Sequence, residues 1–135
     1  MSTQFHQWYG EMQAQRAIQA LKKNNFDAQY FPKAAEALEA LWKMIPEGAT
    51  VGVGGSLTLN QIGFHEAVQK RPVKLLNPMA KGLSPEEGAR IRREIFFADF
   101  FVGSSNAVTE DGKLYNIDAT GNRVAPMIFG PKKVV

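Results

Sequence analysis

The chain has 135 residues, and its 16 basic and 13 acidic side chains give a net charge of +3 with both histidines neutral. Hydrophobic residues make up 44% and occur along the whole length, which argues against intrinsic disorder and predicts a soluble globular domain. Basic residues occur in scattered pairs such as Lys22-Lys23 rather than in a run, so no nucleic-acid partner is expected.

The composition also limits the compartment and the chemistry. There is no cysteine, which excludes disulfides, thiolate metal sites and cysteine nucleophiles within this stretch. No apolar run approaches the ~18 residues of a membrane span, and the first residues do not resemble a secretory signal. We therefore expect a cytoplasmic protein without a membrane partner.

The N-terminal third predicts two helices. Over residues 4–23, apolar side chains recur at steps of three and four, which indicates an amphipathic helix. A short strand is expected over 27–31, followed by a second helix over 34–45. Trp8 and Trp42 are expected to anchor the core.

The middle of the chain alternates strands and helices. Residues 50–53 predict a buried strand, and a helix over 57–70 follows with Ser56 as its N-cap. Another short strand is expected over 73–76. The Ser-Pro-Glu-Glu sequence from Ser84 then opens a further helix, because serine caps, proline suits the first position and acids favour the positive end of the helix dipole.

The C-terminal third begins with a strand over 99–103 and continues through a hairpin at Asp111-Gly112. A turn with a short helix is expected over 120–129, and a central strand begins at 132–135. Because the sequence stops within this strand, we expect a C-terminally truncated domain or a fold completed by another chain. An exposed strand edge there favours a homodimer.

Strands that alternate with helices at this spacing predict a three-layer α/β/α fold with a mostly parallel sheet. We expect a single domain over residues 1–135. Its N-terminal helices would occupy residues 1–48, and the sheet core and the ligand crevice would occupy residues 49–135.

The first candidate site is a glycine-rich loop between a predicted strand and a predicted helix. Glycines let the backbone approach a ligand, and the N–H groups of such a loop converge on an anion. The candidate residues are Gly54, Gly55, Ser56 and Thr58. The alternative is that the glycines only form the turn and Ser56 only caps the helix. The third glycine of a dinucleotide fingerprint is missing, so no nucleotide cofactor is expected.

The second candidate site is the polar stretch 103–123, which begins just after a predicted strand. In a parallel sheet, residues beyond the carboxyl ends of strands face the ligand crevice. The anion-binding candidates here are Asn106, Thr109, Gly121, Asn122 and Arg123. Glu110 and Asp118 are candidate catalytic residues, as general base or nucleophile. The alternative is that the polar residues only form turns and helix caps.

Other chemistries find no support in the sequence. His6 and His65 have no acidic residue at metal-ligand spacing, so no metal site is expected. The Gly-x-Ser-x-Gly motif of a serine hydrolase is absent.

Two long stretches resemble the LUD domain, a lactate-utilisation family formerly described only as a domain of unknown function. They are IPEGATVGVGGSLTLNQIG, residues 45–63, and ADFFVGSSNAVTEDGKLYNIDATGNRVAPMIFGPKKVV, residues 98–135. The segment NNFDAQYFPKAAEALEAL, residues 24–41, fits as well. The resemblance implies the superfold of ribose-phosphate isomerases and CoA-transferases.

The resemblance also implies a function in a bacterial system that oxidises L-lactate to pyruvate. The chain would be a substrate-binding or partner subunit, with a small carboxylate or phosphate as ligand and with redox centres on partner subunits. The alternative is a sugar-phosphate isomerase-like or CoA-transferase-like enzyme, so whether the chain catalyses a reaction itself stays open. Two departures count against that alternative. Asn106 stands where the isomerases carry an aspartate, and Glu110-Asp111-Gly112 only roughly matches the Glu-Asn-Gly motif of the transferases.

Overall fold

The computed structural model describes residues 3–135, and side chains from residue 5 onward. The chain forms two compact units. The first comprises the residues up to Pro32 together with Ser105–Asn116, and the second comprises Lys33–Ser104 together with Ile117–Val135. Both units are therefore built from two separate segments of the sequence.

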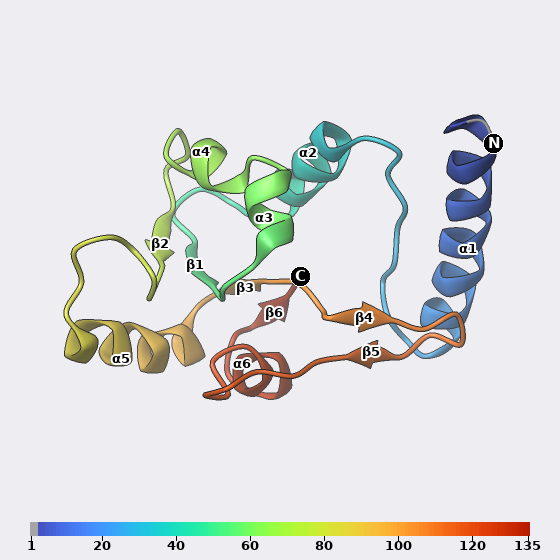
Figure 1. Ribbon diagram of the computed structural model, residues 1–135. Coiled ribbons are helices and arrows are strands. Elements are labelled where there is room, and N and C mark those ends of the chain that lie inside the picture. The colour runs from blue at the N-terminus through green and yellow to red at the C-terminus, as the bar shows by residue number, and fades with distance from the viewer. Residues whose placement is uncertain (1–2) are drawn as a thin grey trace. The chain divides into compact units, whose positions relative to one another are not determined.

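The first unit pairs a long helix with a hairpin. Helix α1 (Thr3–Lys23) packs near the antiparallel strands β4 (Ala107–Val108) and β5 (Leu114–Tyr115) (Figure 1). The amide of Asn24 donates hydrogen bonds to the carbonyls of Asp111 and Gly112, at 3.3 and 2.8 Å. The hairpin predicted at Asp111-Gly112 is confirmed, and this turn is where the helix and hairpin meet.

The second unit contains a four-stranded sheet in the order β2-β1-β3-β6, with every pair parallel. Its strands are β1 (Thr50–Val53), β2 (Lys74–Leu76), β3 (Phe100–Val102) and β6 (Lys133–Val134). The two inner strands are buried, as expected for apolar runs covered on both faces.

Helices cover both faces of this sheet. One side carries α2 (Ala34–Met44), α3 (Leu57–Gln61) and α4 (Phe64–Val68), and the other carries α5 (Pro85–Glu94), the 3-10 helix η1 (Ile95–Phe97) and α6 (Val124–Ile128) (Figure 1). Alternate strand residues point to opposite faces. Val51 and Val102 accordingly join the core with Trp42, whereas Phe101 joins a second core with Ile95. The predicted three-layer fold with a mostly parallel sheet is confirmed.

Local signals explain where two of these helices begin. The Ser56 hydroxyl accepts a hydrogen bond from the N–H of Leu59 at 3.1 Å, which confirms the predicted cap of α3. At α5 the Ser84 hydroxyl accepts from the N–H of Glu87, and the Glu87 carboxylate accepts from the N–H of Ser84. This reciprocal capping box satisfies two N–H groups that a helix start otherwise leaves unpaired.

Three expectations about the elements were wrong. The helix expected over 57–70 is broken into α3 and α4, because Gly63 adopts a left-handed conformation with φ of 75°. Residues 27–31 form no strand, and Tyr30 within this range and Phe26 just before it are exposed. In the described sheet β6 is an outer strand rather than a central one.

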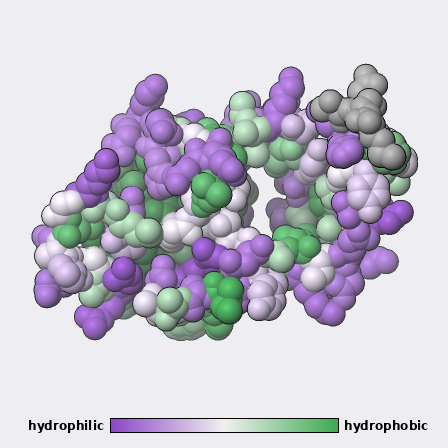
Figure 2. Space-filling view, viewed as in Figure 1, coloured by the Kyte–Doolittle hydropathy of each residue, from purple (hydrophilic) through white to green (hydrophobic). Residues whose placement is uncertain are grey.

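The two tryptophans differ. Trp42 is 6% exposed and stacks on Phe64 with ring centroids 5.2 Å apart, so it is a core anchor as predicted. Trp8 is 55% exposed, so the same expectation was wrong for it. The exposure extends over the N-terminal half of α1, since residues 5–12 are all exposed. Apolar residues reach the surface elsewhere too, and Figure 2 shows green residues among the purple ones on the face it presents.

Within residues 3–135, no helix combines the length and the apolar composition that crossing a bilayer requires.

We expect Gly52→Ala to destabilise the protein by about 1–3 kcal/mol, the usual cost of overpacking a core. A Cβ at Gly52 would lie 2.8 Å from Cγ2 of Ile95, well inside contact distance. The control is Gly10→Ala in α1, where nothing lies within 4 Å of the added carbon. It should raise stability by about 0.5–1 kcal/mol. Urea unfolding followed by circular dichroism measures both, and equal stability of the two variants would contradict the prediction.

Candidate active site at the carboxyl ends of the strands

The glycine-rich loop leaves the carboxyl end of β1 and runs directly into α3. A Cβ at Gly54 would lie 3.3 Å from the ring of Phe101, and one at Gly55 would lie 3.1 Å from the Met79 sulfur. Side chains at these positions would therefore press on neighbours from β3 and from the segment after β2. The glycines let the loop lie close to both.

Ser56 joins two strand ends. Its hydroxyl donates a hydrogen bond to the hydroxyl of Ser104 at 2.9 Å, and Ser104 comes two residues after β3. Because β1 and β3 are neighbouring parallel strands, the polar residues after them meet at one edge of the sheet. The predicted position of Ser56 at this edge is confirmed.

A pocket of about 390 Å³ opens at this edge. Its lining consists of Gly54, Gly55, Ser56, Asn60, His65, Asn77, Met79 and Lys81. The side-chain oxygen of Asn77 accepts a hydrogen bond from the N–H of Met79 at 3.0 Å, which leaves its NH₂ group as a donor. No lining residue is acidic, whereas Lys81 is a cation. The pocket therefore offers mainly hydrogen-bond donors and one positive charge.

Arg123 is hydrogen-bonded to the backbone of the glycine-rich loop. Its guanidinium donates a hydrogen bond to the carbonyl of Gly55 at 3.0 Å, and its Cβ lies near the position that a Cβ of Gly54 would take. Arg123 is half-buried, so this bond is shielded from solvent. The structure thus brings Arg123 and the glycine loop together, as predicted for one site, with a carbonyl as a partner of the arginine.

Asp118 organises the segment that presents Arg123. Its carboxylate accepts hydrogen bonds from four backbone N–H groups: those of Thr120 at 3.1 Å, Gly121, Arg123 at 3.1 Å and Val124 at 2.9 Å. These bonds, the one from Val124 most strongly, hold the pKa of the Asp118 carboxyl below its usual range. Such a carboxylate is a weak base, so the geometry favours a structural role, and a catalytic role of Asp118 stays a prediction.

The remaining predicted residues of the second unit lie in the loop and helix around these two. Gly121 has a φ of 74°, which suits glycine, and donates to Asp118. The side-chain oxygen of Asn122 accepts from the Thr120 hydroxyl at 2.8 Å. Thr58 is an exposed residue of α3. The polar contacts of Asn122 and Gly121 agree with the turn-forming alternative.

Three predicted residues belong to the first unit, in or beside its hairpin. The N–H of Asn106 donates to the carbonyl of Tyr115, and that of Thr109 to the carbonyl of Lys113, both at 3.0 Å. The Glu110 carboxylate accepts from the amide of Gln13 at 3.2 Å and lies 3.8 Å from the guanidinium of Arg16. These contacts tie the hairpin together and to α1, and the roles in catalysis and binding stay predictions.

Sequence reasoning missed three polar residues of the pocket: Asn60, Asn77 and Lys81. Asn77 directly follows β2, so the rule applied to the ends of the other strands would have found it. His65, for which the sequence predicted no metal site, also lines the pocket. Nothing in the sequence pattern points to Lys81, because its place depends on how the segment after β2 folds back. In the described part of the chain, no three metal-ligating side chains converge.

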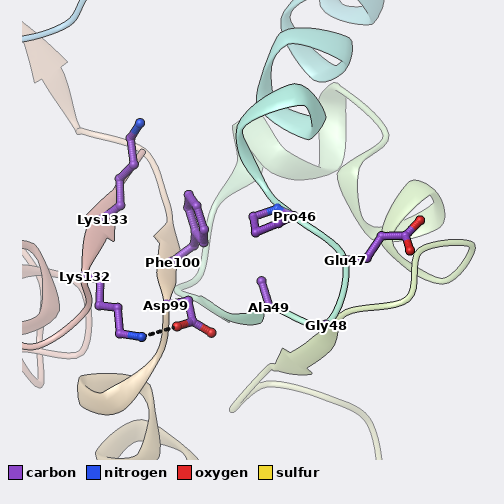
Figure 3. Close-up of a pocket in the computed structure, with 8 residues that line it drawn as sticks. All are labelled: Pro46, Glu47, Gly48, Ala49, Asp99, Phe100, Lys132 and Lys133. Atoms are coloured by element: carbon purple, nitrogen blue, oxygen red, sulfur yellow. Dashed lines mark hydrogen bonds and ion pairs between the residues drawn. The ribbon is translucent and has the colours of Figure 1, made fainter.

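A second pocket, of about 420 Å³, lies at the opposite, amino ends of the strands (Figure 3). There the Asp99 carboxylate accepts from the N–H of Thr50 at 2.9 Å and from the ammonium of Lys132 at 2.7 Å. The bond from Lys132, before that from Thr50, holds the pKa of Asp99 below its usual range. Asp99 thereby ties the start of β3 to the starts of β1 and β6, which is a structural task.

We expect Asp118→Asn to lower the free energy of unfolding at pH 7, since the amide cannot accept all four N–H bonds. The folded pKa of Asp118 lies below the ordinary value of 3.8, so its stabilisation is present above that value. It is lost as the pH falls through the folded pKa. The difference in the free energy of unfolding between wild type and variant should become smaller in acid, as measured by urea unfolding at several pH values. The exposed control Asp27→Asn should show no such narrowing, and a gap independent of pH would contradict this role.

Comparison with known proteins gives one family and no individual relative. No curated protein matches the chain, and no solved structure matches it. The family model described as LUD domain matches residues 14–135, which is nearly the whole chain. The chain therefore belongs to the LUD domain family.

Proposed function

We propose that this LUD-domain protein binds a small carboxylate at the pocket beside its glycine loop, as a substrate-binding or partner subunit in the oxidation of L-lactate to pyruvate. The observation that carries the proposal is the chemistry of the lining: hydrogen-bond donors from the side chains of Asn60 and Asn77, with the cation Lys81 and no acid, while the Ser56 hydroxyl donates to Ser104. The link to lactate comes from the family, and the link to a carboxylate comes from the pocket.

A carboxylate needs several donors at once and gains most from a charged one. Lys81 would supply the charge, while the amides of Asn60 and Asn77 would reach the carboxylate or the neighbouring hydroxyl of lactate. His65 would donate from its ring N–H. Since Lys81 is exposed, its attraction is screened by salt, and we expect weak binding at high ionic strength.

Oxidation of lactate to pyruvate releases two electrons and two protons, so the pathway needs an electron acceptor. We place that acceptor on partner subunits, with this chain holding the substrate or product. Arg123 would act indirectly by fixing the Gly55 carbonyl and with it the shape of the loop.

An enzyme acting on a sugar phosphate or a CoA derivative is the alternative, and it would need a carboxylate free to react. Asp118 accepts four backbone hydrogen bonds, and Glu110 lies beside Gln13 and Arg16. These environments favour structural roles for both acids. Support for the enzyme would come from preference for phosphate ligands.

The proposal is tested by calorimetric titration of the wild-type protein with L-lactate, pyruvate, a sugar phosphate and CoA. We expect lactate or pyruvate to bind, and Lys81→Ala to weaken that binding about tenfold, which corresponds to roughly 1.4 kcal/mol, the loss of one charge-assisted hydrogen bond at an exposed site. The matched control is Lys70→Ala, an exposed lysine of the same unit outside the pocket, which should leave affinity unchanged.

Three results would overturn the proposal. If Lys81→Ala binds the ligand as strongly as wild type, the pocket is not the binding site. Binding of the sugar phosphate or CoA alone would favour the alternative, an enzyme acting on such a substrate. If no ligand binds even at low salt, the isolated chain has no carboxylate site.

A further inference from the structure

Helix α1 exposes an aromatic stripe that its own unit does not use. The stripe consists of Phe5, Trp8, Tyr9 and Met12, which are 52%, 55%, 52% and 40% exposed. Their spacing of three and four residues places them on one side of the helix. The rings of Phe5 and Trp8 contact each other, with centroids 5.8 Å apart, so the stripe is a continuous surface.

This stripe is distinct from the part of α1 that packs within the unit. Ala14, Ala17 and Leu21 are half-buried or buried, and they lie on roughly the opposite side of the helix from the stripe. Helix α1 therefore has two apolar faces, and only the one toward its C-terminal end is covered by the first unit.

We propose that the aromatic stripe is a dimer interface that pairs with the same stripe of a second copy of this chain in antiparallel orientation. In a two-fold interface each side chain faces copies of its own surface, so like charges would meet and repel. Within residues 3–15, Glu11 is the one acidic residue and no lysine or arginine occurs. Glu11 lies beside Trp8 at the edge of the stripe, and Arg16 follows Met12 by one turn on the stripe side. The four stripe residues themselves carry no charge, so like charges do not meet at the centre of the contact.

The charges at the other end of α1 select the antiparallel arrangement. Lys22 and Lys23 form the last turn of the helix. In a parallel pair they would lie beside their own copies, whereas an antiparallel pair centred between Trp8 and Tyr9 separates them by about 40 Å. Antiparallel helix dipoles also attract. This register places Trp8 opposite Tyr9 of the second copy, and Phe5 opposite Met12, which are favourable aromatic and sulfur–aromatic pairs.

The same residues argue against a membrane surface as the occupant. Helices that lie on membranes combine an aromatic face with lysine and arginine along the polar side. Around this stripe most polar residues are uncharged, namely His6, Gln7, Gln13 and Gln15, and the charged ones are a single acid, Glu11, and a single base, Arg16. Glutamine both donates and accepts hydrogen bonds, so it suits contact with its own copy.

The area of the stripe sets the strength of the dimer. Three aromatic side chains that are about half exposed, with Met12, offer roughly 300–450 Å² per copy. Two copies would bury less than the ~1,200 Å² of a typical stable complex. We expect a weak dimer that forms at micromolar to sub-millimolar concentrations.

Sedimentation equilibrium over about 5–500 µM tests the interface. Wild type should dimerise, and Trp8→Ala should raise the dissociation constant at least tenfold. Phe97→Ala is the matched control, because Phe97 is an aromatic residue that is 85% exposed in the second unit. It should stay within twofold of wild type. Circular dichroism must show that helix content is retained in Trp8→Ala.

Single cysteines test the orientation, since the chain has no cysteine of its own. In the antiparallel pair, the two copies of residue 9 are offset by about 1.5 Å along the helix, and the two copies of residue 12 by about 10 Å. Oxidation should therefore link Tyr9→Cys dimers but not Met12→Cys dimers, because a disulfide requires Cα atoms within about 7 Å.

Other outcomes would overturn the proposal. A wild-type monomer at 500 µM would do so, as would dimerisation that Trp8→Ala leaves intact. Cross-linking of Met12→Cys as efficiently as Tyr9→Cys would overturn the antiparallel pairing. A monomer that binds vesicles of anionic phospholipid through Trp8 would assign the stripe to a membrane instead.

Discussion

The close packing of the second unit depends on positions in and after β1 that carry no side chain. Gly52 faces Ile95 across one side of the sheet, and the backbone at Gly54 and Gly55 passes within contact distance of Phe101 and Met79. A methyl group at any of these positions would press on a neighbour. The glycines therefore bring the helical layer and the segment after β2 close to the strand, and the same closeness shapes the pocket.

A series of hydrogen bonds holds the glycine-rich loop in this close position beside the pocket. Asp118 fixes the backbone at Arg123, and Arg123 fixes the carbonyl of Gly55. Ser56 then links the loop to Ser104, and its hydroxyl also caps α3. Polar residues that sequence reasoning assigned to ligand binding or catalysis thus hold the loop in place. A loop held at both ends can present its donors without a large ordering cost when a ligand arrives.

Much of the fold could be predicted because its signals are local. The apolar runs at β1 and β3 identified buried strands, and the Ser-Pro-Glu-Glu sequence from Ser84 located the start of α5. The errors arose where local signals compete with tertiary ones. Gly63 reads as a tolerated helix residue, yet its left-handed conformation ends one helix and begins another.

The exposure of Trp8 was not predicted, for a different reason. The apolar pattern of α1 correctly predicted a helix, but a pattern states only which residues share a side. It does not state which of two apolar sides packs on the rest of the unit. Helix α1 has both an aromatic and an aliphatic side, and the hairpin meets the helix at Ala20 and Leu21, near its C-terminal end.

The candidate site, too, could be predicted from the sequence only in part. The rule that ligands meet the carboxyl ends of parallel strands located Gly54, Gly55 and Ser56, and it would have located Asn77 had it been applied to β2. It could not supply Lys81, since that position is brought to the pocket by a loop of no recognisable pattern. It also could not predict that the Asp118 carboxylate accepts hydrogen bonds from four backbone N–H groups. A carboxylate engaged in this way is a weaker base, so in the proposed carboxylate site recognition would rest on the amide donors and on Lys81.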